Sequence, residues 1–257
     1  MAHRPATTTL AATWLPADPA VTRVAGAGAY DPSLAAQLDV REAVVGVLTE
    51  RRDGLERALA ALSARPDALA AAVATLVEAL RTGHKVLIAG NGGSAAEAQH
   101  FAAELIGRFK REREPYAVIA LTADTAVLTA IANDYGYADV FARQVAALAC
   151  PGDVLLLFST SGESENIVRA AHLGRQRGVR VMAITGTGGC RLHRLADVVV
   201  EAGDGDAAAV QEAHVVMTHV LCDIVESTLA ASGQGPSGNG ESVVGVARPG
   251  VLDGRTR

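Results

Sequence analysis

A histidine and a glutamate, His100 and Glu104, stand four residues apart in a stretch whose apolar spacing predicts a helix over residues 94–109. Residues at positions i and i+4 share one helical face, so these side chains can act together. They suit proton transfer, or they suit two ligands of one metal ion. An isolated pair of this kind is usually a hydrogen bond on a helix surface. Here it follows a glycine-rich loop by two turns, which favours a functional role.

The loop before this helix, residues 90–94, reads Gly-Asn-Gly-Gly-Ser and follows the apolar run from Val86 to Ala89. A strand that ends in a glycine-rich turn and continues as a helix directs backbone N–H groups into the adjacent crevice. Gly92 and Gly93 permit close approach of a ligand, and Ser94 can cap the helix while offering its hydroxyl. The loop, including Asn91, predicts an anion site, although ordinary strand–helix connections have the same composition.

A second loop, Ser-Thr-Ser-Gly-Glu-Ser at residues 159–164, follows the apolar strand expected at residues 153–158. Hydroxyl donors and free N–H groups at a helix start can bind a phosphate dianion without a lysine. The alternative is a simple cap, with Ser161 capping the helix and Ser164 solvated. The four hydroxyls of Ser159, Thr160, Ser161 and Ser164 exceed what capping requires, so we predict a phosphate site. The similar segment at residues 185–189 has fewer hydroxyls and is predicted to be a structural turn.

The last predicted helix, residues 208–231, is apolar nearly all round, which predicts a buried helix. Its polar residues therefore need hydrogen-bonding partners or a functional role. At about 100° per residue, Glu212 lies near 20° from His219, whereas Gln211 lies about 80° away. Spacing alone therefore pairs Glu212 with His219, and Gln211 converges only if the site lies at the helix start. A lone histidine in such a helix, including His214, is more often a core residue than a ligand.

Two further polar segments could serve either a structural or a functional role. Asn133 and Asp134 stand at a predicted helix end, where both residue types are good turn formers, yet the connection can bring them to the crevice. The basic cluster of residues 108–113 is interrupted by Glu112, and it predicts a solvated helix end.

Apolar runs alternate with helical patterns along the middle of the chain. Strands are expected at residues 85–89, 116–121, 153–158, 179–184 and 197–200. Helices are expected at residues 41–63, 68–82, 94–109, 125–132, 137–149, 163–177 and 208–231. Nearly continuous apolar strands indicate a parallel sheet covered on both faces. The predicted fold is therefore α/β: a three-layer αβα open doubly wound parallel sheet, flavodoxin-like, with N-terminal helices.

Composition narrows the class of protein. The net charge of −5 gives no electrostatic footprint for nucleic acid or for an anionic membrane. Three scattered cysteines, without a Cys-x-x-Cys motif, suggest neither a disulfide framework nor a thiolate zinc site. We see no signal peptide and no apolar segment of 18 residues, so a cytoplasmic location is expected. Residues 1–42 and 233–257 are predicted to be flexible arms around a domain at residues 43–232.

Four segments together resemble one known family: GNGGSAAEAQHFAAELIGRF from Gly90, ANDYG from Ala132, STSGESEN from Ser159 and QEAHVVMTH from Gln211. They are similar to the sedoheptulose-7-phosphate isomerases, or phosphoheptose isomerases, of the wider sugar-isomerase (SIS) fold. The resemblance covers roughly residues 45–232, and the segments occur in the family's order. The STSG loop is shared across the superfamily, whereas the combination of His100, Glu104, Gln211 and His219 is much more specific.

The resemblance implies roles for individual residues. Glu104 and His219 would be the catalytic acid–base pair, and a Zn2+ ion would be held by His100, Glu104, Gln211 and His219. This selects Gln211 over Glu212 by analogy and not by spacing. The substrate contacts implied are Asn91, Gly92, Gly93, Glu104, Asn133, Asp134, Ser159, Thr160, Ser161, Ser164 and Gln211. The hydroxyl of Ser94 in the first loop is a further candidate.

The implied reaction is aldose–ketose isomerisation of sedoheptulose 7-phosphate to D-glycero-D-manno-heptose 7-phosphate, or its altro epimer, through an enediol(ate). Family members are typically homotetramers with active sites at subunit interfaces, so the same is expected here. The alternative is a non-catalytic SIS-fold adaptor that binds the bacterial replication initiator, which would not need four convergent His, Glu and Gln side chains. A third possibility is another SIS enzyme, such as an arabinose-phosphate isomerase or an amino-sugar enzyme.

Overall fold

The computed structural model describes residues 40–231 of the chain. The chain divides into two compact units, residues 1–49 and residues 50–257. The described part of the first unit, residues 40–49, forms the start of helix α2 (Val40–Ala64). The predicted arms lie outside the described residues, except that residues 40–42 are helical and do not belong to an arm.

A parallel sheet of five strands forms the centre of the second unit, in the order β2-β1-β3-β4-β5. The strands are β1 (Val86–Ala89), β2 (Val118–Ala120), β3 (Val154–Ser159), β4 (Arg180–Thr185) and β5 (Val198–Glu201). Every residue of β1 and β3 is buried, as their apolar sequences predict. This strand order confirms the predicted doubly wound fold. The chain adds strands toward one edge of the sheet after β1 and toward the other edge from β3 onward, so the switch point lies between β1 and β3.

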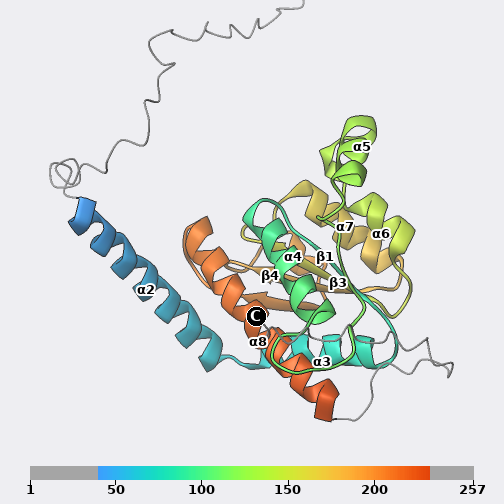
Figure 1. The fold of residues 1–257 in the computed structure, drawn as a ribbon. Coiled ribbons are helices and arrows are strands. Elements are labelled where there is room, and N and C mark those ends of the chain that lie inside the picture. The colour runs from blue at the N-terminus through green and yellow to red at the C-terminus, as the bar shows by residue number, and fades with distance from the viewer. Residues whose placement is uncertain (1–39, 232–257) are drawn as a thin grey trace, which may run out of the picture. The chain divides into compact units, whose positions relative to one another are not determined.

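Helices cover both faces of the sheet (Figure 1). Val86 and Ile88 of β1 pack into one core with α3 (Asp67–Arg81), α4 (Gly93–Ile106) and α8 (Ala207–Ala231). Leu87 and Ala89 point the other way, into a core with α5 (Thr125–Tyr135), α6 (Ala142–Leu148) and α7 (Glu165–Gln176). Alternate residues of one strand therefore supply both layers, which is the three-layer arrangement predicted.

Three helices differ from the prediction by more than two residues, and one of them, α5, runs three residues past the expected end at residue 132. The expected helix over residues 137–149 is broken into a short 3-10 helix, Tyr137–Asp139, and α6. The helix expected over residues 94–109 ends at Ile106, so Phe109 lies in the loop that follows α4. Apolar spacing alone does not register these interruptions, because the residues beyond each break keep a helical pattern.

Within residues 40–231, no single helix is long and apolar enough to cross a membrane, and α2 and α3 pass that test only as a pair bent by 75°.

Candidate active site

Three side chains from two helices converge on one point. His100 and Glu104 of α4 approach each other to 3.2 Å between Nε2 and Oε1, and His219 of α8 places its Nε2 3.3 Å from the His100 Nε2. The two imidazole rings meet edge to face, with centroids 5.0 Å apart. Since α4 and α8 pack directly against each other, residues 119 positions apart become neighbours. The predicted convergence of these three residues is present in the structure.

These three groups have a spacing that suits a metal ion. One ligand atom from each lies within 4.8 Å of the others. Ligand atoms about 2.0–2.1 Å from a tetrahedral zinc ion stand roughly 3.3 Å apart, which matches the separations of 3.2 and 3.3 Å found here. The His100 and Glu104 side chains are 34% and 24% exposed, so the cluster is accessible from solvent. Imidazole and carboxylate are ordinary zinc ligands, and the site fits that ion.

A cavity of about 450 Å³ adjoins the cluster between the start of α4 and the first half of α8. Its wall includes His100, Gly93, Ser94 and Gln211. Gln211 lies so close to Gly93 that a Cβ at that position would come within 2.6 Å of its side-chain amide. Gly93 is therefore needed for this approach, and a larger residue there would displace the amide from the cavity.

Glu212, which spacing alone pairs with His219, has a different partner. Its carboxylate lies 3.9 Å from the Arg51 guanidinium of α2, while it also borders the cavity. Glu212 is absent from the His100, Glu104 and His219 cluster, so its predicted pairing with His219 is wrong, while Gln211 packs against Gly93 in the cavity wall. Glu104 and His219 do not line the cavity. His100 belongs both to the cavity wall and to the cluster, so it connects the two.

The first loop is tied to the hydroxyl-rich loop by a pair of amides. Asn91 and Asn166 exchange two hydrogen bonds, of 2.9 and 2.8 Å. Asn166 lies in the first turn of α7, directly after residues 159–164, and the two loops follow the neighbouring strands β1 and β3. They meet where the strand order reverses, which is the usual ligand position in such sheets. Tyr137, which the sequence analysis did not single out, donates a third bond to Asn91, of 3.0 Å.

The hydroxyl-rich loop keeps its donors available. Ser159 is buried, and its Oγ accepts a bond from the Gly162 N–H, while the Ser161 Oγ accepts one from the Glu163 N–H. A hydroxyl that accepts still has its own proton to donate, so both can donate to a phosphate oxygen. The capping alternative is wrong in detail, because the residue at the cap of α7 is Ser164 and it makes no side-chain cap bond.

Three other expectations meet the structure in part. Ser94 lies inside the first turn of α4 and lines the cavity, but Gly92 is the capping residue. Asn133 and Asp134 are exposed at the end of α5 and hydrogen bond each other, and neither is among the residues that line the cavity beside His100. Thr160 stays half-buried in its loop.

In the cluster of residues 108–113, the prediction of a solvated helix end is confirmed for the exposed Arg108, Lys110, Arg111 and Glu112 but is wrong for Arg113, and the segment follows the end of α4 at Ile106. The side chain of Arg113 is 6% exposed and lies 3.2 Å from the fully buried Glu226. The sequence signal for this contact was Glu226, a glutamate within an otherwise apolar helix, because a buried carboxylate needs polar or charged partners.

His214 has a pKa lowered to about 4, chiefly because burial disfavours its charged form, with the Thr185 backbone opposing the shift in part. Neither ring nitrogen has a well-aligned hydrogen bond among the described residues. The unfolded imidazole titrates near 6.5, so between pH 6.5 and 4 the unfolded chain binds more protons. Stability therefore falls as the pH is lowered through this window.

Between pH 6.5 and pH 4 the unfolding free energy of the wild type should fall because of His214. We predict that this fall is smaller by about 3 kcal/mol in His214→Leu, because the variant has no imidazole to titrate at that position. Urea unfolding at several pH values measures it. His172→Leu, at an exposed position of α7, is the control and keeps the wild-type slope. Equal slopes in wild type and His214→Leu would show that His214 titrates normally.

The sequence and the fold of this chain are similar to those of known proteins. The SIS domain family model matches residues 50–186. The phosphoheptose isomerase of Bradyrhizobium sp. (strain ORS 278) is 47% identical over 184 residues, which cover 71% of this chain and 91% of that protein. That of Pelobacter propionicus is 49% identical over 177 residues, covering 68% and 94%. A solved structure of phosphoheptose isomerase from Neisseria gonorrhoeae superposes with a TM-score of 0.67 at 37% identity, covering 73% and 99%.

The family match spans more than half of the chain, and the relatives are covered over nearly their whole length. The chain is an isomerase and belongs to the phosphoheptose isomerases of the SIS-domain family.

Proposed function

We propose that this isomerase converts sedoheptulose 7-phosphate into D-glycero-D-manno-heptose 7-phosphate, or its altro epimer, through an enediol(ate). The observation that carries the proposal is the convergence of Glu104 and His219 around His100, beside a cavity bordered by the loop after β1. The names of the relatives supply the substrate class. The expected cytoplasmic location stays a prediction.

The phosphate is proposed to bind at residues 159–164. The support is the free hydroxyl protons of Ser159 and Ser161 and the unused hydroxyl of Ser164 at the start of α7. The positive end of the α7 dipole favours a dianion at that point. Asn91 ties this loop to the one that borders the cavity, so the open-chain sugar can extend from one to the other.

The proposed chemistry is proton transfer at carbons 1 and 2. One of Glu104 and His219 removes a proton from carbon 1, and the C–H electron pair becomes the carbon 1–carbon 2 double bond. The carbonyl oxygen on carbon 2 then takes a proton, with the other residue as its donor. In the second half, the hydroxyl on carbon 1 loses its proton to form the aldehyde, and carbon 2 takes one. Each positioned acid–base group contributes about 10²–10⁴-fold.

A zinc ion is proposed to be held by His100, Glu104, His219 and the amide oxygen of Gln211. The support is the ligand spacing and the position of Gln211 against Gly93. When bound, such an ion acts as a Lewis acid that polarises the carbonyl and stabilises the enediolate.

Assembly as a homotetramer with active sites at subunit interfaces is proposed from the family resemblance, and an apolar groove of about 700 Å³ between α3 and α8 supports a subunit contact. Val73, Val77 and Ile224 line it, and Ile224 is 43% exposed. Exposed apolar surface of this kind is typical of a protein contact. The molar mass of the full chain by light scattering tests this, and a monomer would contradict it.

The function is tested by incubating the purified full chain with sedoheptulose 7-phosphate and following the sugar by NMR. We expect an aldose product, whose coupling constants identify the configuration at carbon 2. A folded chain that forms no aldose, with or without added zinc, would contradict the proposal. That outcome would favour the adaptor role, which has no use for the convergent His and Glu side chains.

A further inference from the structure

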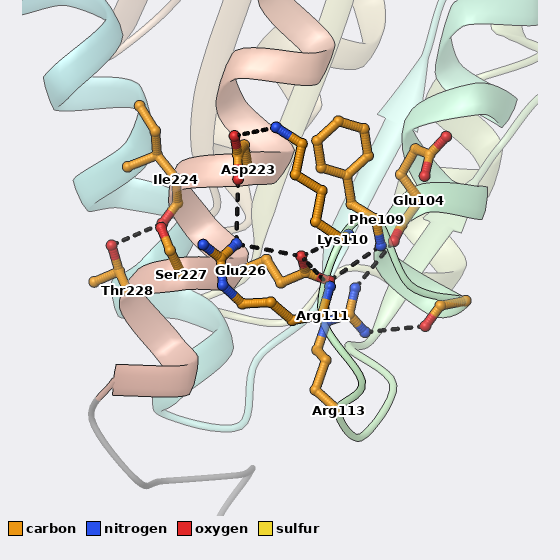
Figure 2. A network of polar contacts seen from close by, with 11 residues as sticks. Glu104, Phe109, Lys110, Arg111, Arg113, Asp223, Ile224, Glu226, Ser227 and Thr228 are labelled. Atoms are coloured by element: carbon orange, nitrogen blue, oxygen red, sulfur yellow. Dashed lines mark hydrogen bonds and ion pairs between the residues drawn. The ribbon is translucent and has the colours of Figure 1, made fainter.

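Glu226 is a fully buried carboxylate in α8, and it binds the backbone of a distant loop. Its oxygens accept bonds from the N–H groups of Phe109 at 3.0 Å, Lys110 at 2.8 Å and Arg111 at 2.9 Å (Figure 2). Burial raises the pKa of Glu226, but these bonds and the nearby Arg113 outweigh it, so the pKa lies below its ordinary value. The carboxylate therefore stays charged and fixes three consecutive backbone groups.

Arg113 connects the same loop to the end of α4. Its guanidinium donates to the carbonyl oxygens of Glu104 at 2.9 Å and Leu105 at 2.8 Å. Its Nε lies 3.2 Å from Glu226, so one buried ion pair joins α4, the loop and α8. In Figure 2 the loop runs between these two helices, and Glu104 stands on α4.

Phe109 is the residue through which this loop reaches the candidate active site. Its ring stacks on the imidazole of His219, with centroids 5.4 Å apart and planes 25° from parallel. His100 meets the same imidazole edge to face. The His219 ring is thus confined between two aromatic neighbours, one of which is fixed by Glu226. A flat ring against its face leaves the imidazole little freedom to rotate.

We propose that Phe109 is a positioning residue for His219, and that Glu226 holds Phe109 in place. This inference rests on the proposed function, because it matters to rate only if His219 acts in the reaction. Phe109 is not assigned a contact with the reacting atoms. It keeps the His219 Nε2 directed toward the His100 Nε2 and the Glu104 carboxylate. Small errors in the placement of a reacting group cost on the order of 100-fold in rate.

The test compares Phe109→Leu with Phe109→Tyr in the full chain. The leucine removes the flat ring but keeps an apolar side chain, whereas the tyrosine keeps the ring. We expect Phe109→Leu to lower kcat on the order of 10- to 100-fold with KM nearly unchanged, and Phe109→Tyr to stay within about threefold of wild type. A merely structural role would lower the thermal midpoint of both variants and leave kcat per folded enzyme unchanged, which would overturn the proposal.

A second readout does not depend on turnover. Protons of an imidazole above an aromatic face are shielded, so the His219 ring signal should lie upfield in the wild type. Among the seven histidines it is assigned by its loss in His219→Asn. Phe109→Leu should move it downfield, and Phe109→Tyr should not. A signal that does not move with Phe109→Leu would contradict the stacking.

The two proposals fail in different ways. If the wild type forms no aldose but the His219 signal responds to Phe109→Leu, the proposed function is wrong and the positioning contact stands. If the wild type isomerises and Phe109→Leu matches its kcat, the positioning role is wrong. Glu226→Gln completes the series, because an amide cannot accept all three backbone bonds. A His219 signal unchanged in that variant would remove Glu226 from the account and leave Phe109 in it.

Discussion

Replacing Glu104 by glutamine is expected to lower turnover of sedoheptulose 7-phosphate by about 10³-fold or more. The amide has nearly the same shape as the carboxylate but cannot take a proton at neutral pH. It also cannot balance the charge of a metal ion beside His100. The Glu104 side chain is 24% exposed and forms no ion pair with a Lys or Arg side chain in the described residues, so folding should be preserved. Steady-state kinetics together with circular dichroism measure both effects.

Glu112→Gln is the matched control for this prediction. Its side chain is 86% exposed and lies 3.8 Å from Arg108, so the same chemical change occurs on the surface. We expect near wild-type kinetics from it, because exposed ion pairs contribute little. A Glu104→Gln enzyme with a near wild-type rate would remove Glu104 from the catalytic pair.

Replacing His219 by asparagine is expected to remove both activity and stoichiometric zinc. His219 supplies the only ligand atom from α8 in the described His-Glu-His cluster, and its Nε2 lies 3.3 Å from that of His100. Asparagine is shorter, so its amide does not reach the same point, and kcat should fall by about 10²–10⁴-fold. Elemental analysis of the purified protein measures the metal.

His172→Asn provides the comparison, because His172 is exposed on α7 and belongs to no part of the candidate site. It should retain zinc and rate. Full zinc in His219→Asn would take His219 off the ligand set, even if activity were lost.

The fold was predictable because its signals are local. Each strand is a short apolar run. Strands β1 and β3 are buried at every position, as their apolar composition predicts. The pairing of His100 with Glu104 is also local, since one helical turn separates them. The parallel direction of the strands was predictable from the alternation of strands and helices along the chain, since that alternation permits few topologies.

The parts that could not be predicted depend on distant partners. Phe109 and Glu226 are 117 residues apart, and nothing near Phe109 shows that its backbone will meet a carboxylate. For the same reason the charges of residues 108–113 suggested a solvated end, although Arg113 is buried against Glu226. Spacing also paired Glu212 with His219, whereas the Glu212 carboxylate lies 3.9 Å from Arg51 of α2, a distant partner that helical angles do not reveal.

The placement of the substrate is tested most directly by a crystal structure of the full chain carrying Glu104→Gln, soaked with sedoheptulose 7-phosphate. We expect the phosphate within hydrogen-bonding distance of residues 159–164, with carbons 1 and 2 of the sugar between residue 104 and His219. A sugar bound with those two carbons away from both side chains, or a phosphate bound elsewhere, would contradict this expectation.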